Sequence, residues 1–346
     1  MALKTAEEYV ERLWKMKPNV YAHGKKMGRD DPILKLPINT LKFTFDAVND
    51  PELKDLVVTE SHLTGEKINR FTSINLSIED LYTQQEMKRK CCHRVGGCTQ
   101  RCMATDTLNA MGVVSKEIDD DKGTHYHDHF LEFLKYYQAN DLVGSTAQTD
   151  PKGDRKARPF QQEDPDLYLH VVDKNSKGIV VRGAKNHITM GPYVDEHLVL
   201  PTRNMTKEES EWAVSFAIPA DTEGIRIISR IVTPRGRIDL KAPYNNYGVS
   251  DSVVIFDNVF VPWDRVFMCG EWEFAGRLAL TFAGFHRHSY CGCKPAVTDI
   301  ILGATALVAE YNGVGNSPHI VDELTELMII AELVYASGIA AAAKAT

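Results

Sequence analysis

Cysteine is the residue type best able to do chemistry in this chain, and six of its seven cysteines fall in two short segments. The first segment spans residues 91–102 and the second spans residues 286–294. Clustered cysteines bind metals or catalyse more often than they form structural disulfides in a reducing compartment. An odd number of cysteines also argues against a framework of disulfides. The seven are Cys91, Cys92, Cys98, Cys102, Cys269, Cys291 and Cys293.

In the first segment, Gly96 and Gly97 are expected to end one helix and to let another begin. On that next helix Cys98 and Cys102 would stand four residues apart, with Cβ atoms about 5–6 Å from each other on one face. Two thiolates at that separation suit adjacent irons of a cluster, or a single zinc ion. They also suit two small apolar core residues, which is a common state of free cysteine. The spacing alone leaves these interpretations open.

The second segment holds two imidazoles, two thiols, a phenol and an ammonium within nine positions. Such a density of titratable groups is costly to bury without a function. The alternative is a helix with a polar stripe and a few buried cysteines. Because nothing comparable lies between the two segments, we predict one site assembled from both. The groups are His286, His288, Tyr290, Cys291, Cys293 and Lys294.

The elements that would position these residues change in type along the chain. Helical spacing dominates residues 1–140, and short β-type runs closed by Pro201, Pro219, Pro234 and Pro262 dominate residues 141–268. Helical patterns return over residues 269–346. We therefore expect an α+β protein with an N-terminal helical domain, a middle β-barrel or sandwich domain, and the start of a C-terminal helical domain. The last helix lacks a stop signal, so we expect the chain to be truncated.

The composition is that of an ordinary soluble globular protein, with a net charge of −7 and 43% hydrophobic residues. It excludes a disordered tail, a fibre and a polybasic nucleic-acid binder. No run of apolar residues reaches the roughly 18 that a membrane span needs. The N-terminus has no secretory signal, and Thr5 with Glu8 predicts a capping box instead. We expect a cytoplasmic protein without membrane or nucleic-acid partners.

Several stretches, in order, resemble the 4-hydroxybutyryl-CoA dehydratases, a branch of the 4-hydroxyphenylacetate 3-monooxygenase large-component family with an acyl-CoA dehydrogenase-like fold. The most specific is the Cys-x3-Cys pair combined with His-x6-Cys. The Phe-Asp-Asn-Val-x-Val-Pro stretch is shared by all acyl-CoA dehydrogenase-like proteins and says little of function. The matching stretches are residues 98–102, 149–155, 178–185, 254–262 and 282–294.

The resemblance implies two cofactors. Cys98, Cys102, His286 and Cys293 would bind a 4Fe–4S cluster, and the other four cysteines would be bystanders. The chain has no G-x-G-x-x-G motif, so FAD would lie against the β domain rather than in a Rossmann fold. For residues 149–151 an ordinary Asx turn is the alternative. The implied FAD-binding residues are Gln100, Thr149, Asp150, Pro151, Lys152 and Thr189.

The implied activity is that of a hydro-lyase, which converts 4-hydroxybutyryl-CoA to crotonyl-CoA and water by a radical mechanism and isomerises vinylacetyl-CoA as a side activity. His286 would act as iron ligand and base, Tyr290 would assist proton transfer, and Lys294 would hold a carbonyl or anionic oxygen. Asp251 stands where the family usually has a glutamate, one methylene longer. The family also continues with further helices that carry another active-site glutamate and FAD contacts. We expect a homo-oligomer, a dimer or tetramer, that binds an acyl-CoA.

Three other functions are alternatives. One is an isomerase-only relative, which has the same set. Another is a flavin-dependent monooxygenase of the same fold, which lacks the four-ligand set. The last is a non-enzymatic scaffold stapled by zinc through three cysteines and a histidine.

Overall fold

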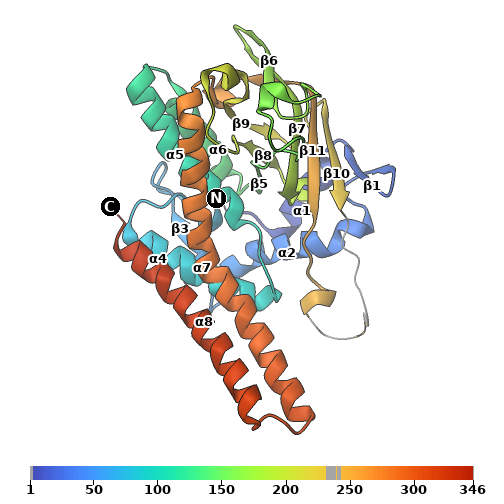
Figure 1. Ribbon diagram of the computed structural model, residues 1–346, viewed down its shortest axis with the longest axis vertical. Helices are drawn as coiled ribbons and strands as arrows, with labels where there is room; N and C mark the ends of the chain where they lie inside the picture. Colours follow the sequence, from blue (N-terminus) through green and yellow to red (C-terminus); the bar gives the residue numbers. More distant parts are fainter. Residues whose placement is uncertain (1–2, 231–238, 240–242, 346) are drawn as a thin grey trace.

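The computed structural model describes residues 3–230, 239 and 243–345, and Figure 1 shows two packed sheets flanked by helices. Mixed helix and sheet was the fold class expected from the sequence, and the structure confirms it. The helices are α1 (Ala6–Lys15), α2 (Lys35–Asp46), α3 (Lys54–Val57), α4 (Ile78–Val95), α5 (Cys102–Lys122), α6 (Tyr126–Ala139), α7 (Trp272–Tyr311) and α8 (Pro318–Ala343).

The strands form one sheet of six, one of four and one of two among the described residues. In the six-stranded sheet the order is β2-β1-β10-β11-β7-β6, and in the four-stranded sheet it is β12-β9-β8-β5. The strands are β1 (Val20–Ala22), β2 (Lys25–Met27), β3 (Val58–Glu60), β4 (Lys67–Asn69), β5 (Gly144–Ala147), β6 (His170–Asn175), β7 (Gly178–Thr189), β8 (Glu196–Val199), β9 (Val214–Pro219), β10 (Ile225–Arg230), β11 (Asp251–Pro262) and β12 (Val266–Cys269).

The two larger sheets pack on each other as a sandwich. Phe216 of β9 meets Phe256 of β11 edge to face, with ring centroids 6.0 Å apart, and both rings are buried. Strands β1 and β2 come from the first 30 residues, yet β1 pairs in parallel with β10. The division of the chain into three domains stays a proposal. Residues 20–27, from its N-terminal part, extend the six-stranded sheet of the middle part.

The helix ends agree with the capping signals in the sequence. Thr5 and Glu8 form the predicted capping box, with the Glu8 amide donating to Thr5 Oγ1 at 3.1 Å. Helix α4 begins after Ser77, whose side chain accepts from the Asp80 amide. It ends at Gly96, which takes the left-handed conformation at φ 70° that glycine adopts at low cost.

Helices α7 and α8 form a long antiparallel pair that extends away from the sheets (Figure 1). The first half of α7 packs against α4 and α5, and Cys293 and Ala296 are buried there. Among the described residues, these two helices are long and apolar enough to cross a membrane by length and composition alone. The absence of a membrane partner therefore stays a prediction.

Candidate active site

The predicted helix carrying both Cys98 and Cys102 is not formed, and this expectation was wrong. Helix α5 begins at Cys102, whereas Cys98 lies in the loop after α4. Gln100 causes the difference, because its backbone takes the left-handed conformation at φ 67°, which a right-handed helix cannot contain. The loop instead turns back on itself, and the Gln100 amide donates to Cys98 Sγ at 3.3 Å.

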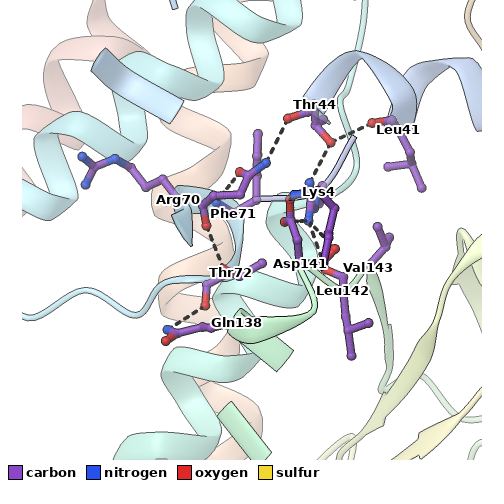
Figure 2. Close-up of polar contacts among 12 residues, drawn as sticks. Lys4, Leu41, Thr44, Arg70, Phe71, Thr72, Gln138, Asp141, Leu142 and Val143 are labelled. Atoms are coloured by element: carbon purple, nitrogen blue, oxygen red, sulfur yellow. Dashed lines mark hydrogen bonds and ion pairs between the residues drawn. The ribbon is translucent and has the colours of Figure 1, made fainter. Parts of the chain in front are cut away.

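This loop is held by two fully buried polar side chains, of which Arg101 is the first. Its guanidinium donates to Thr44 Oγ1, to the Asp141 carboxylate and to the Leu142 carbonyl. These acceptors come from α2 and from the segment after α6, and Figure 2 shows them gathered together. The same guanidinium stacks over Phe45 at 4.3 Å. These contacts therefore hold Arg101, the residue directly before α5, in place.

Gln100 is the second buried anchor. Its Oε1 accepts from the Tyr193 hydroxyl at 2.7 Å, and its Nε2 donates to the Gly248 carbonyl at 2.9 Å. The Tyr193 hydroxyl also accepts from the Ser250 amide at 3.0 Å. The loop that carries Cys98 is thus tied to the start of β11. A role of Gln100 toward a flavin stays a prediction.

Three of the four predicted ligands meet in the structure. Hydrogen bonds with the Cys102 and Cys293 thiols lower the pKa of Cys98 well below its ordinary value, and they raise the pKa values of the two partner thiols. The His286 ring is close enough to lower the pKa of Cys98 further. Residues from the loop, from α5 and from α7 are therefore brought together, and their role as metal ligands stays a prediction.

These side chains are not arranged as a site for a single metal ion. Within residues 3–230, 239 and 243–345, no three His, Cys, Asp or Glu side chains form a group that would hold one ion. The Cys98 thiol interacts with both the Cys102 and the Cys293 thiols, and His286 lies near it. Three thiols and an imidazole are ligand types that a core of several irons could take, one at each iron.

The site also contains side chains that the sequence analysis missed. Asp106 Oδ2 lies 2.8 Å from His286 Nδ1, and its carboxylate accepts from Ser289 Oγ at 2.7 Å. Lys88 Nζ donates to the same Ser289 Oγ at 2.7 Å. One signal could have found Asp106, because it stands four residues after Cys102 and so on the same face of α5.

The remaining predicted catalytic residues of α7 lie beside His286. The Tyr290 ring is 4.5 Å from the His286 ring, centroid to centroid, and the Lys294 ammonium lies over the Tyr290 ring at 4.9 Å. Burial raises the pKa of Tyr290, and the nearby cysteine thiols raise it further. His286, Tyr290 and Lys294 thus follow one another along α7, as their spacing predicted.

Two of the four cysteines expected to be bystanders, Cys92 and Cys91, lie near the proposed ligands. Burial, with a smaller contribution from Cys98, raises the pKa of Cys92 to about 12. Cys92 is buried with Cys293 and Ala296. Cys91 packs in an apolar cluster that also contains Cys102. Cys269 ends β12, and Cys291 is half-buried on α7.

The residues predicted for the flavin fall in two places on the β side. Thr189 and Asp251 are register partners between β7 and β11, and the Thr189 hydroxyl donates to the Asp251 carboxylate at 2.6 Å. Asp251 is close to Tyr193, because its charge raises the pKa of that buried phenol. Thr189 and Asp251 therefore lie near Tyr193, whose hydroxyl also holds Gln100 of the loop that carries Cys98.

The second place is an open cavity of about 290 Å³. Asp150 is bound to the buried ammonium of Lys185 at 2.7 Å, and Lys185 also donates to the carbonyls of Gln148 and Leu200. The segment is thus more firmly held than the isolated Asx turn considered above. The cavity is lined by Thr149, Asp150, Pro151, Lys152, Arg155, Tyr168, Thr202 and Arg203.

Residues 5–268 match the family described as 4-hydroxyphenylacetate 3-hydroxylase N terminal, and residues 275–346 match its C-terminal counterpart. The chain belongs to this family. An acyl-CoA dehydrogenase from Geobacillus kaustophilus shares the fold alone, with a TM-score of 0.50 and 14% identity over 80% of this chain and 67% of its own.

Within the family, this chain is similar to dehydratases. It is 42% identical to the 4-hydroxybutyryl-CoA dehydratase/vinylacetyl-CoA-Δ-isomerase of Clostridium aminobutyricum, over 99% of this chain and 71% of that protein. An oxygen-tolerant archaeal 4-hydroxybutyryl-CoA dehydratase from N. maritimus superposes with a TM-score of 0.90 and 37% identity, over 98% of this chain and 69% of that one.

The family also contains oxygenases. The oxygenase component of 4-hydroxyphenylacetate 3-monooxygenase, in complex with FAD, superposes with a TM-score of 0.87 and 25% identity, over 99% of this chain and 72% of that one. The resemblance inferred from the cysteine motifs is confirmed by these comparisons, and identity is higher to the dehydratases than to this oxygenase.

Proposed function

We propose that this chain is a lyase that dehydrates 4-hydroxybutyryl-CoA to crotonyl-CoA and also isomerises vinylacetyl-CoA. The observation that carries the proposal is the meeting of Cys98, Cys102 and Cys293 beside His286, from segments almost 200 positions apart. The identity of 42% to a dehydratase/isomerase supports the same reaction.

The donor set fits an iron–sulfur cluster, because three thiols and one imidazole would each bind one iron. Cys98, Cys102, Cys293 and His286 would hold it. When bound, the cluster would supply a Lewis-acidic iron for the leaving hydroxyl, at the position that carries the more easily displaced imidazole ligand.

FAD is the second proposed cofactor, supported by the FAD complex of the related oxygenase. It would supply a one-electron acceptor during the reaction. Thr189, Gln100 and the segment 149–152 are the residues proposed to contact it. The cavity beside residues 149–152 carries Lys152, Arg155 and Arg203, whose charges suit the phosphates of a dinucleotide or of coenzyme A.

The chain's own side chains would then handle the protons and the oxygens. His286 is proposed to remove the proton next to the thioester carbonyl, which is the most acidic carbon-bound proton of this substrate, through Nε2 when that nitrogen is not bound to iron. Tyr290, in contact with the imidazole, would relay a proton, and the exposed ammonium of Lys294 would hold a carbonyl or anionic oxygen. Asp251, shorter by one methylene than the family glutamate, would act from the β11 side.

Anaerobic purification followed by analysis of iron, sulfide, zinc and flavin tests the cofactors. We expect about four irons and four sulfides per chain and one flavin, from the stoichiometry of a 4Fe–4S cluster. A colourless protein with one zinc ion would contradict the proposal and favour the scaffold reading.

Turnover under anaerobic conditions tests the reaction. We expect crotonyl-CoA from both 4-hydroxybutyryl-CoA and vinylacetyl-CoA. Product from vinylacetyl-CoA alone would identify an isomerase-only enzyme. A protein without iron that consumes oxygen with reduced flavin would identify a monooxygenase.

A further inference from the structure

Behind His286 lies a group of buried polar side chains that the proposed reaction does not use. Lys88 comes from α4, Asp106 from α5 and Ser289 from α7, and each is at most 2% exposed. Burying a carboxylate and an ammonium costs several kcal/mol for each ion, unless the two are paired and hydrogen-bonded. Even a paired buried ion pair seldom adds net stability, which points to another role for this group.

Every polar atom of this group has a partner. Ser289 Oγ accepts from Lys88 and donates to Asp106, and Lys88 Nζ lies 3.6 Å from Asp106 Oδ1. Asp106 Oδ2 is thereby left facing His286 Nδ1 at 2.8 Å. An ionised carboxylate can only accept a hydrogen bond, so this contact places a hydrogen on Nδ1.

The other ring nitrogen of His286 is left bare. Nε2 has no hydrogen-bond partner among the described residues, and the ring plane is fixed by stacking on Phe282 at 5.3 Å and 12°. A neutral imidazole with its hydrogen on Nδ1 presents a lone pair on Nε2, which is the atom a metal ion or a proton would meet.

We propose that Asp106 is a positioning residue that fixes the Nδ1–H tautomer and the orientation of His286, with Lys88 and Ser289 holding the carboxylate in place. This inference rests on the proposed function only for the identity of the group that Nε2 would face. Carboxylates in this position commonly orient the histidine ligands of metals, and their loss typically weakens metal binding roughly 10- to 100-fold.

The first test uses the full chain without metal, labelled with ¹⁵N-histidine. Two- and three-bond ¹H–¹⁵N correlations report which ring nitrogen carries the hydrogen. We expect His286 to carry it on Nδ1, and finding it on Nε2 in the unvaried chain would overturn the inference. Because this measurement needs no variant, it decides the question even where a substitution prevents folding.

The second test compares Asp106→Asn with Asp299→Asn. Asp299 is a matched control, because it also contacts a histidine, His93 Nε2 at 2.7 Å, but lies outside the site. After anaerobic reconstitution, we expect the Asp106 variant to lose iron to a chelator roughly 10- to 100-fold faster than the Asp299 variant. It should also populate the Nε2–H form in the metal-free chain.

Equal rates of iron loss from the two variants would contradict the role of Asp106. If none of the chains binds iron, the proposed function fails, whereas the tautomer of His286 still tests the inference. The two failures are thus distinguishable.

Discussion

At the scale of single residues, α7 places two cysteines two positions apart in different surroundings. The Cys293 thiol hydrogen-bonds to Cys98, whereas Cys291 is half-buried and its thiol donates only to the Arg287 carbonyl one turn earlier. Substituting each cysteine in turn therefore distinguishes the loss of a proposed ligand from the loss of any thiol on this helix.

We predict that Cys293→Ser lowers bound iron and sulfide by roughly tenfold or more, because even changes outside the ligand set cost about tenfold in metal affinity. Cys291→Ser should bind as much iron as the unvaried chain. Iron and sulfide analysis after anaerobic purification measures both. Similar losses in the two variants would show that Cys293 is no ligand.

A second residue-scale feature makes stability depend on pH. His197 is completely buried, and its Nδ1 contacts Ser145 Oγ at 2.7 Å while its Nε2 has no partner. Burial, with a smaller contribution from the nearby Arg29, lowers the pKa of His197 to about 3. In the unfolded chain its pKa is close to 6.5. Between these values the unfolded chain binds the extra proton, so stability falls as the pH falls.

We predict that the free energy of unfolding falls by roughly 1.4 kcal/mol per pH unit from this residue below pH 6.5. His197→Asn should lose most of this slope between pH 6.5 and pH 5. Urea unfolding of both chains at several pH values measures it. Burial raises the pKa of Glu196 to about 7. Glu196 contributes equally to the pH dependence of the unfolding free energy in both chains. Parallel slopes in the two chains would contradict the prediction.

At the scale of elements, the ligand set depends on how closely α4 approaches α7. A Cβ atom on Gly292 would lie 2.4 Å from the Gln85 carbonyl oxygen of α4. Gly292 stands directly before Cys293, so this contact fixes the spacing of the two helices beside the ligand. Gly303, farther along α7, has no atom within 4 Å of an added Cβ.

We predict that Gly292→Ala costs about 1–3 kcal/mol of stability and lowers iron content, because an added methyl group forces α4 away from α7. Gly303→Ala should instead stabilise the chain by about 1 kcal/mol, from helix propensity alone. Thermal unfolding and iron analysis test the pair. A neutral Gly292→Ala would mean that the helices move apart without cost.

Sequence patterns predicted much of this arrangement but not its local turns. Strand and helix periodicity gave the α-β-α order, and the motifs gave the four candidate ligands. The helix through Cys98 was predicted wrongly, because nothing marks Gln100 as a residue held in the left-handed region by Tyr193 and Gly248, which are distant in sequence. Lys88 and Ser289 were missed for the same reason, since their partners come from other helices.

At the scale of the whole molecule, the outer part of the α7–α8 pair leaves many large apolar side chains exposed. Large apolar side chains exposed in one part of a protein are typical of a surface that contacts a protein partner or a membrane. The residues are Ile301, Leu307, Val308, Tyr311, Val321, Met328, Ile329, Ile330 and Leu333.

We predict that a second copy of the chain covers this surface, in line with the expected homo-oligomer. Ile329→Glu should shift the protein to a smaller species, because a charge buried in an apolar interface costs several kcal/mol. Light scattering after gel filtration measures the mass, and Glu326→Gln on the same helix is the control. A monomeric unvaried chain, or an Ile329→Glu protein of unchanged mass, would contradict this prediction.

The distance along the chain between the site's two halves has a consequence for biosynthesis. Residues 98 and 102 leave the ribosome long before residues 286 and 293, and strands β5 to β12 lie between them in the sequence. Contacts so remote in sequence form late in folding. Iron delivered to the nascent polypeptide would find only part of the proposed ligand set, so we expect the proposed centre to mature only after α7 has docked.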